Sequence, residues 1–471
     1  MKALMNHSPS VGVERVPIGA MNDMPPISRL QVRQAELVPG QVNTWYEYIP
    51  ERYEAGGEPV PLVVQLHGGG QDGRRWASLT MWHLMAEREN LIVVYPNSPQ
   101  YGCWMCDDTD VQYLYDLIER LCDCYRIDRS RIYMQGMSNG DMMTLAFTMK
   151  HPEVLAAAGY MTGPSAEEAV EDERPVGALP ILQMRGELDV AWKLTPETVD
   201  VYATRYGMND FNRALWLEAN GTDTASPVLS IRGKDNFLLY RGRNAPIINW
   251  EIQGMGHREP SCSGQVLWDR LYSGCRMENG QRVLTQPRMP IQADKDIVLL
   301  AAGSRYAWCG DHRVAVSDVP QASCRIVVPA KEGRFCPVYL GEMAETEAFY
   351  APVETFSKIF GADITFSYAG EQAAICLKDG RKVILRSHAL LIEVDGVVDE
   401  LQKPCMLLGG VLYVPIGELA QMLFNSHVSM ADDMLCIAGH YALLGRYTAR
   451  QIRGLLGGSM RPRQKPVWDA E

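Results

Sequence analysis

Residues 132–140 read I-Y-M-Q-G-M-S-N-G, a pattern that predicts a strand, a sharp turn and the start of a helix. The apolar run over residues 132–134 predicts a buried strand, and a helix-like stretch follows over residues 141–150. Between them stands G-x-S-x-G, which is a weak motif alone but predicts a sharp turn with an exposed hydroxyl when it joins a strand to a helix. We therefore predict that Ser138 is a catalytic nucleophile and that the backbone N–H of Asn139 faces a developing oxyanion.

A glycine-rich loop upstream predicts the rest of an oxyanion site. Residues 61–66 (P-L-V-V-Q-L) read as a buried parallel strand, and H-G-G-G follows at once over residues 67–70. Glycines let the backbone approach a substrate oxygen and leave an N–H unshielded, so Gly69 is predicted as the second donor. We expect His67 to be structural.

An activated serine also needs an acid and a base, and in α/β-hydrolases they follow the serine in that order. Residues 181–184 (I-L-Q-M) read as another buried strand, which is followed by R-G-E-L-D. The carboxyl end of a parallel strand is where such a sheet places its site residues. Asp189 is the predicted acid, with Glu187 as the alternative.

Only two histidines follow Ser138 within the first 290 residues. His151 ends the helix-like stretch, where a cationic side chain near a helix C-terminus has an ordinary structural explanation. His257 follows a strand pattern and lies in a turn between glycines, G-M-G-H, which suits a bent loop that presents an imidazole. His257 is the predicted base.

Five stretches make the chain resemble the poly(3-hydroxybutyrate) depolymerase-like family, which includes feruloyl and acetylxylan esterases. They are Y-E-Y-I-P-E-R-Y from residue 46, L-V-V-Q-L-H-G-G-G-Q from residue 62, Y-R-I-D-R-S-R-I-Y-M-Q-G-M-S-N-G from residue 125, R-G-E-L-D ending at Asp189, and G-M-G-H ending at His257. The resemblance implies an α/β-hydrolase, a doubly wound and mostly parallel sheet, over residues 36–278. It also implies a triad of Ser138, Asp189 and His257, with Asn139 and Gly69 holding the oxyanion.

The implied reaction is a two-step acyl transfer on small or sugar-linked esters of the feruloyl or acetyl type, without a metal or an organic cofactor. The family has a Trp-Pro pair soon after its histidine, whereas this chain has R-E-P over residues 258–260. The family also has His where this chain has Arg185, and Gly where this chain has Asp141. Three tryptophans are predicted to line the acyl pocket: Trp76, Trp104 and Trp192. The alternative for each of them is a position in the hydrophobic core.

The second half of the chain changes pattern. Residues 279–290 read as a linker, and short alternating strands with turns follow. A weak repeat appears there, because an aromatic-apolar segment and short helix starting at Phe349 are echoed 63 residues later, at Leu412. Residues 291–445 resemble the stalk-like domain named after the N-terminal domain of copper amine oxidases. That resemblance implies a smaller mixed, β-rich spacer or attachment module that binds no copper and is able to associate with a cell wall or polysaccharide.

Bulk properties exclude some partners. A net charge of −12 argues against nucleic acid and anionic membrane surfaces. The N-terminal extension, residues 1–35, lacks the apolar segment of a signal peptide, which predicts a cytoplasmic protein, whereas the family resemblance favours secretion or the cell surface. Residues 446–471 are expected to be a tail.

The chain has 12 cysteines, which fit reduced thiols in a cytoplasmic protein. Cys103–Cys106 and Cys262–Cys275 are the pairs expected to form disulfides if the protein is exported. A zinc site from Cys103, Cys106, Cys122 and Cys124 is disfavoured, because the last two diverge on a helix.

Two other functions remain open from sequence. One is a serine peptidase of the prolyl oligopeptidase type, although the chain lacks that family's large partner domain. The other is an inactive hydrolase fold that serves as a binding or surface protein, since residue order does not establish hydrogen-bonding distance.

Overall fold

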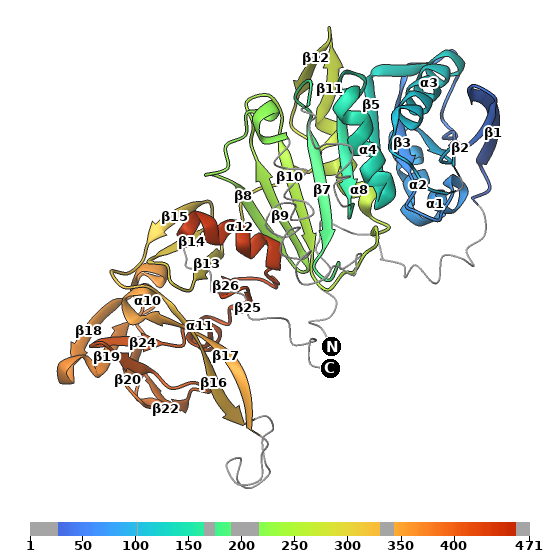
Figure 1. Cartoon of the computed structure of the whole chain (residues 1–471). Coiled ribbons are helices and arrows are strands. Elements are labelled where there is room, and N and C mark those ends of the chain that lie inside the picture. Colours follow the sequence, from blue (N-terminus) through green and yellow to red (C-terminus); the bar gives the residue numbers. More distant parts are fainter. Residues whose placement is uncertain (1–26, 101, 164–174, 190–215, 330–342, 458–471) are drawn as a thin grey trace. The chain divides into compact units, whose positions relative to one another are not determined.

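The structure is a computed structural model that describes residues 27–100, 102–163, 175–189, 216–329 and 343–457 (Figure 1). By its internal contacts the chain separates into two compact units. The first runs to residue 292 without residues 231–233, and the second comprises those three residues and the chain from residue 293. Each unit is described by itself.

The first unit is built on one ten-stranded sheet in the order β1-β2-β4-β3-β5-β6-β7-β10-β9-β8. The five pairings from β4 through β3, β5, β6 and β7 to β10 are parallel, whereas β1 and β2 are antiparallel additions at one edge. The strands are β1 (Leu30–Val38), β2 (Gln41–Tyr48), β3 (Val60–Leu66), β4 (Ile92–Pro96), β5 (Ile127–Met137), β6 (Ala157–Met161), β7 (Ile181–Gly186), β8 (Val228–Arg232), β9 (Asp235–Tyr240) and β10 (Ile247–Ile252). The predicted α/β architecture around a large sheet is confirmed. The sheet is parallel at its centre and antiparallel toward both edges, since β9 runs antiparallel to β10.

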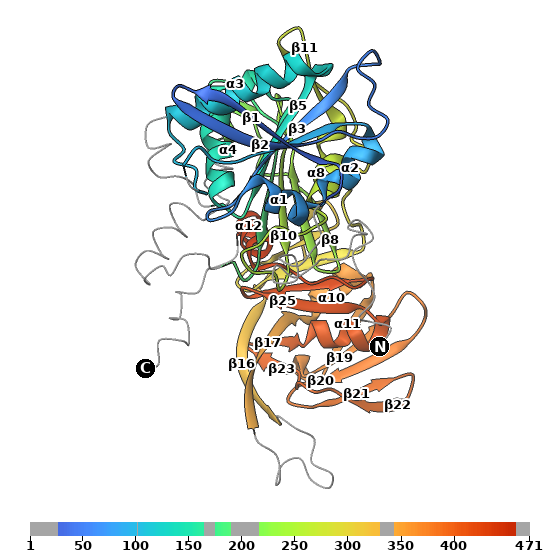
Figure 2. The ribbon, with the colours of Figure 1, turned by 90° about the vertical axis from the view of Figure 1, so that its right-hand side faces the viewer.

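Helices cover both faces of this sheet, as Figure 2 shows. The helices α3 (Asp108–Cys124) and α4 (Asn139–Lys150) pack together on one face, and α2 (Trp82–Glu89) and α8 (Ser263–Arg270) pack together on the other. A further helix, α1 (Gly73–Thr80), contacts β3 and β4. Because both faces are covered, β3, β4, β6 and β7 are buried along their whole length, which explains their predominantly apolar sequences.

The second unit contains three antiparallel sheets. Their orders are β15-β14-β13-β26-β25, β16-β17-β24-β23 and β18-β19-β20-β21-β22. The strands are β13 (Ile297–Ala301), β14 (Tyr306–Cys309), β15 (His312–Ala315), β16 (Ala322–Pro329), β17 (Met343–Pro352), β18 (Asp363–Ser367), β19 (Gln372–Cys376), β20 (Lys382–Arg386), β21 (Leu391–Val394), β22 (Val397–Glu400), β23 (Met406–Leu408), β24 (Val411–Val414), β25 (His427–Ala431) and β26 (Met434–Ala438). Side chains from all three sheets share one core.

The repeat in the second unit has a structural counterpart. The end of β17 leads into α10 (Val353–Phe360) and then β18, just as β24 leads into α11 (Ile416–Phe424) and then β25. The two copies meet where Ala351 pairs with Val414.

Three boundaries differ from those expected from sequence. Part of the expected linker, residues 279–290, is the strand β12 (Gln281–Leu284), which pairs with β11 (Cys275–Glu278). The expected tail begins with the helix α12 (Arg446–Leu456), whose apolar side is buried. The expected N-terminal extension includes β1 from Leu30 onward. Each of these segments is short and lies beside a turn, so its hydrophobic pattern is too brief to distinguish a strand or helix from a loop.

No helix in the described ranges is long and apolar enough to cross a membrane.

Candidate active site

Ser138 lies at a strained turn between β5 and α4. Its backbone has φ 56° and ψ −117°, a conformation that costs free energy for a residue with a side chain and is held by its surroundings. The flanking glycines explain how the turn closes. A Cβ on Gly136 would lie 2.0 Å from the carbonyl oxygen of Gly140, and one on Gly140 would lie 2.3 Å from that of Leu66. The motif glycines are therefore required by backbone packing around the serine.

The structure brings the three predicted triad residues into one hydrogen-bonded chain. The Nε2 atom of His257 lies 2.9 Å from the hydroxyl oxygen of Ser138, and its Nδ1 atom lies 2.9 Å from Oδ1 of Asp189. Asp189 is only 3% exposed, whereas the His257 side chain is 26% exposed. A buried carboxylate behind a partly open imidazole is the arrangement that lets a histidine take a proton from a serine.

The loops that carry the acid and the base are joined by main-chain contacts. The Leu188 N–H donates to the Met255 carbonyl at 2.9 Å, and the Gly254 N–H donates to Oε2 of Glu187 at 3.0 Å. The alternative acid, Glu187, therefore holds the histidine loop by its backbone, and it is Asp189 that contacts the imidazole of His257.

Two backbone amides are available beside Ser138. The N–H groups of Gly69 and Asn139 donate no hydrogen bond within the described part of the chain, and the two residues are neighbours, since a Cβ on Gly69 would lie 3.7 Å from that of Asn139. Asn139 is also the first residue of α4, where the helix dipole favours negative charge. The next amide, that of Gly70, is already bonded to the Gly102 carbonyl at 2.8 Å.

The side chain of Asn139 fixes this region in place. Its Oδ1 accepts from the Trp104 N–H at 2.6 Å, and its Nδ2 donates to the Trp104 carbonyl at 2.9 Å. The Trp104 indole N–H in turn donates to the His67 carbonyl at 3.1 Å. Through these hydrogen bonds Trp104 links the start of α4 to the glycine loop.

His67 has the structural position expected of it. The ring is fully buried, its Nε2 accepts from the Ser98 N–H at 3.1 Å, and its Nδ1 lies 2.8 Å from the Gly68 carbonyl. Burial lowers the pKa of His67, which favours the neutral ring that these two contacts need. The other histidine, His151, caps α4 and lies 3.2 Å from Glu153.

Two of the three predicted pocket tryptophans occupy core positions. Trp76 is 2% exposed and Trp104 is 3% exposed, which fits the core alternative left open for each. Trp104 contributes to the site through its backbone hydrogen bonds with Asn139 and its contact with His67, whose ring centroid lies 5.3 Å away. The third, Trp192, lies outside the described residues.

A buried polar cluster beneath the site was missed by the sequence analysis. Gln135, three residues before Ser138, accepts from Gln65 at 3.1 Å and from the Trp82 indole at 2.9 Å, and it donates to Glu259. The signal was present: a glutamine interrupts each of the buried runs in β3 and β5, and a buried amide needs partners. Burial raises the pKa of Glu259 to about 7.

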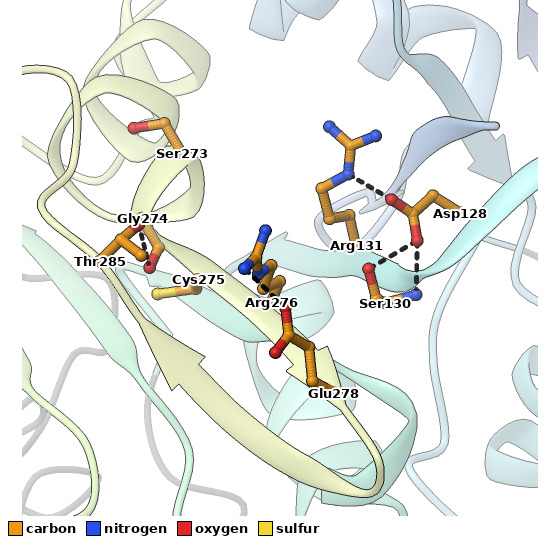
Figure 3. Close-up of a pocket in the computed structure, with 9 residues that line it drawn as sticks. All are labelled: Asp128, Ser130, Arg131, Ser273, Gly274, Cys275, Arg276, Glu278 and Thr285. Carbon is orange, nitrogen blue, oxygen red and sulfur yellow. Dashed lines mark hydrogen bonds and ion pairs between the residues drawn. The ribbon is translucent and has the colours of Figure 1, made fainter. Parts of the chain in front are cut away.

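A cavity of about 350 Å³ lies elsewhere in the first unit, beside the start of β5 and the β11–β12 hairpin (Figure 3). Its arginines already have partners, since Arg131 pairs with Asp128 at 2.5 Å and Arg276 pairs with Glu278 at 2.6 Å. Ser138 follows the opposite end of β5, so this cavity is separate from the triad.

Within the described residues no group of His, Cys, Asp and Glu side chains has the arrangement of a metal site. The described cysteines are free thiols, including the two pairs considered for disulfides. Cys106 donates to the Trp104 carbonyl, and burial raises its pKa to about 12.

One family model and several known proteins are similar to this chain. The family model described as esterase PHB depolymerase matches residues 46–208. The chain is 28% identical over 223 residues to the bifunctional acetylxylan esterase/xylanase XynS20E of Neocallimastix patriciarum, which covers 44% of this chain and 30% of that protein. It is 29% identical over 128 residues to feruloyl esterase B of Neurospora crassa, which covers 25% of this chain and 43% of that protein.

The chain thus spans less than half the length of these curated relatives. Among solved structures, acetyl xylan esterase from Aspergillus awamori aligns with 49% of this chain and 95% of its own, with a TM-score of 0.39 and 19% identity. The matched family region contains the glycine loop, Ser138 and Asp189, and it ends before His257.

Proposed function

We propose that this protein is a serine carboxylic ester hydrolase that works through an acyl-enzyme. The observation that carries the proposal is the continuous hydrogen-bonded chain from Asp189 through His257 to Ser138, with the unengaged amides of Gly69 and Asn139 beside the hydroxyl. Nucleophile, base, orienting acid and oxyanion donors are the parts that acyl transfer needs. The likeness of residues 46–208 to esterases supports the same reaction class.

In the first step Nε2 of His257 takes the Ser138 proton while Oγ attacks the ester carbonyl carbon. The carbonyl electron pair moves to oxygen, and the Gly69 and Asn139 amides donate to that oxyanion. The tetrahedral intermediate collapses, the C–O bond to the alcohol breaks, and the alcohol leaves with the proton from His257. Water then attacks the acyl group by the same route and releases the carboxylic acid, which restores Ser138.

We propose small or sugar-linked acyl esters as substrates, of the feruloyl or acetyl type. The support comes from relatives whose names state acetylxylan esterase or feruloyl esterase activity. The open position of Gly69 and the partial exposure of Ser138 are compatible with a bulky alcohol group that stays in solvent.

For the second unit we propose a spacer or attachment role of the stalk type, which would place the protein at a cell wall or polysaccharide. The two strand–helix–strand copies that share the unit's core support a structural module. Sedimentation of the full chain with insoluble xylan and with purified cell wall tests this role. Retention on neither would count against attachment.

The reaction is tested with a panel of p-nitrophenyl acyl esters and methyl ferulate, using the parent protein and Ser138→Ala. We expect turnover by the parent and a loss of at least about 10³-fold in kcat for the variant. Turnover that survives in Ser138→Ala would refute the nucleophile. A folded parent that hydrolyses no ester would favour a peptidase or a binding protein instead.

A further inference from the structure

The polar cluster beneath the triad joins the two loops on which the reaction depends. Glu259 follows His257 by two residues, and Gln135 precedes Ser138 by three. The Gln135 side chain donates from Nε2 to Oε1 of Glu259, and the Ser263 hydroxyl donates to the same oxygen. The base loop is therefore tied by one side-chain contact to the strand that ends at the nucleophile.

The strand end of this tie is rigid. Gln135 is fully buried, and its Oε1 is held by Gln65 at 3.1 Å and by the Trp82 indole N–H at 2.9 Å. Trp82 is itself packed against α8, where a Cβ on Gly264 would lie 2.9 Å from the indole. With both of its acceptor contacts filled, the Gln135 amide is fixed in the orientation that aims its N–H₂ group at Glu259.

The loop end is titratable. Oε2 of Glu259 is buried and has no hydrogen-bond partner within the described part of the chain. Burial raises the pKa of Glu259 to about 7, although the hydrogen bonds from Ser263 and Gln135 act in the opposite direction. An ionised carboxylate with one bare, buried oxygen is costly, and a movement that admits water would relieve that cost.

The groups that face Glu259 from neighbouring elements are uncharged near neutral pH. The amide of Gln135 and the hydroxyl of Ser263, which both donate to Glu259, carry no charge. Tyr95 of β4 and the Tyr272 phenol next to α8 interact electrostatically with Glu259, and burial raises the pKa of both phenols above its usual value. Among Glu259 and the groups that contact it in the described part of the chain, the ionisation of Glu259 itself is therefore the charge change expected near neutral pH.

We infer that Glu259 is a positioning residue for the proposed hydrolysis: through Gln135 it ties the His257 loop to the Ser138 strand, and its neutral form holds the imidazole against the serine. The inference rests on the proposed function and adds a second titrating group to it. Ionisation of Glu259 loosens the loop, lengthens the contact between His257 and Ser138, and slows proton transfer.

The test measures kcat and KM for p-nitrophenyl acetate from pH 5.5 to 9, read at the isosbestic wavelength of p-nitrophenol. Five proteins are compared: the parent, Glu259→Gln, Glu259→Ala, Ser138→Ala and one control variant. Gln has nearly the shape of a neutral Glu, keeps an acceptor for Gln135 and Ser263, and cannot ionise. The matched control is Glu119→Gln, which changes an exposed carboxylate on α3 that pairs with Arg129.

We expect the parent's kcat to fall severalfold as the pH rises past about 7, and we expect Glu259→Gln to keep its plateau through this range. Glu259→Ala should lose about tenfold or more in kcat at every pH, with KM changed much less, because the tie is removed. The profile of Glu119→Gln should follow that of the parent.

Superimposable pH profiles for the parent and Glu259→Gln would overturn the inference while leaving the esterase intact. Survival of turnover in Ser138→Ala, or no turnover by the parent, would instead overturn the proposed function and the inference with it. Glu259→Ala also tests folding. If its thermal transition is lost while the pH profile of Glu259→Gln is the same as that of the parent, Glu259 has only a structural role.

Discussion

Gly186 and Met255 are packed so closely that a Cβ on Gly186 would lie 2.1 Å from the Met255 carbonyl oxygen. Gly186 ends β7 before the acid loop, and Met255 lies two residues before His257. The distance between the acid and the base therefore depends on a backbone contact that tolerates no side chain.

Gly186→Ala is predicted to push these loops apart. We expect a fall of at least about tenfold in kcat and a destabilisation of roughly 1–3 kcal/mol, because the clash is with backbone and not with a flexible side chain. Ester hydrolysis and thermal unfolding measure the two effects. Gly454→Ala is the control, since a Cβ there meets nothing within 4 Å. Full activity in Gly186→Ala would show that the loop contact is unimportant.

Asp189 and Glu187 should differ sharply in their effects. Asp189→Asn removes the acceptor that orients His257, and we expect kcat to fall by about 10²–10⁴-fold. Glu187→Gln keeps an acceptor for the Gly254 N–H and should stay within about threefold of the parent. Steady-state kinetics on the same ester decide between them, and the reverse order of effects would make Glu187 the functional acid.

Asn139→Ala keeps the backbone N–H proposed as an oxyanion donor but removes both contacts with Trp104. We expect a loss of about 10–100-fold in kcat with little change in KM, because only the transition state develops the negative charge. Asn244→Ala, which removes one exposed hydrogen bond to Ala219, is the control. If the two variants lose stability and activity alike, the contacts with Trp104 have no special role at the site.

Stability should also report the ionisation of Glu259. Its folded-state pKa of about 7 is raised from 4.5, so the folded protein binds this proton more tightly than the unfolded chain does. The favourable contribution is therefore complete below about pH 4.5 and is lost as the pH rises through about 7, a decrease on the order of 3 kcal/mol. Urea unfolding of the parent and Glu259→Gln across this range isolates the effect as a difference. A difference that stays constant with pH would contradict it.

The sequence predicts most of the first unit because its signals are local. G-x-S-x-G marks a turn whose two glycines leave no room for a Cβ, and predominantly apolar runs mark strands covered on both faces, as in β3 and β7. The three residues picked out by their order along the chain, Ser138, Asp189 and His257, are joined by hydrogen bonds in the structure, with His257 between the other two.

What the sequence leaves out are contacts between distant segments. Gln135 and Glu259 are 124 residues apart, and no spacing rule links a strand glutamine to a loop glutamate. The pairing of Trp104 with Asn139 is hidden for the same reason. The Asn139 side chain bonds to the Trp104 backbone, and a backbone group has no residue type that the sequence could reveal. An indole is equally suited to a pocket wall and to a core, and only burial separates the two.

If His257 activates Ser138, the serine should react with a reagent that labels activated serines covalently. The protein is incubated with an alkyl fluorophosphonate, and the adduct is measured by intact mass and located by peptide mapping. We expect one adduct on Ser138, none in Ser138→Ala, and labelling slowed by at least about 10²-fold in His257→Ala. A folded parent that stays unlabelled, or an adduct on another residue, would contradict the activation of Ser138 by His257.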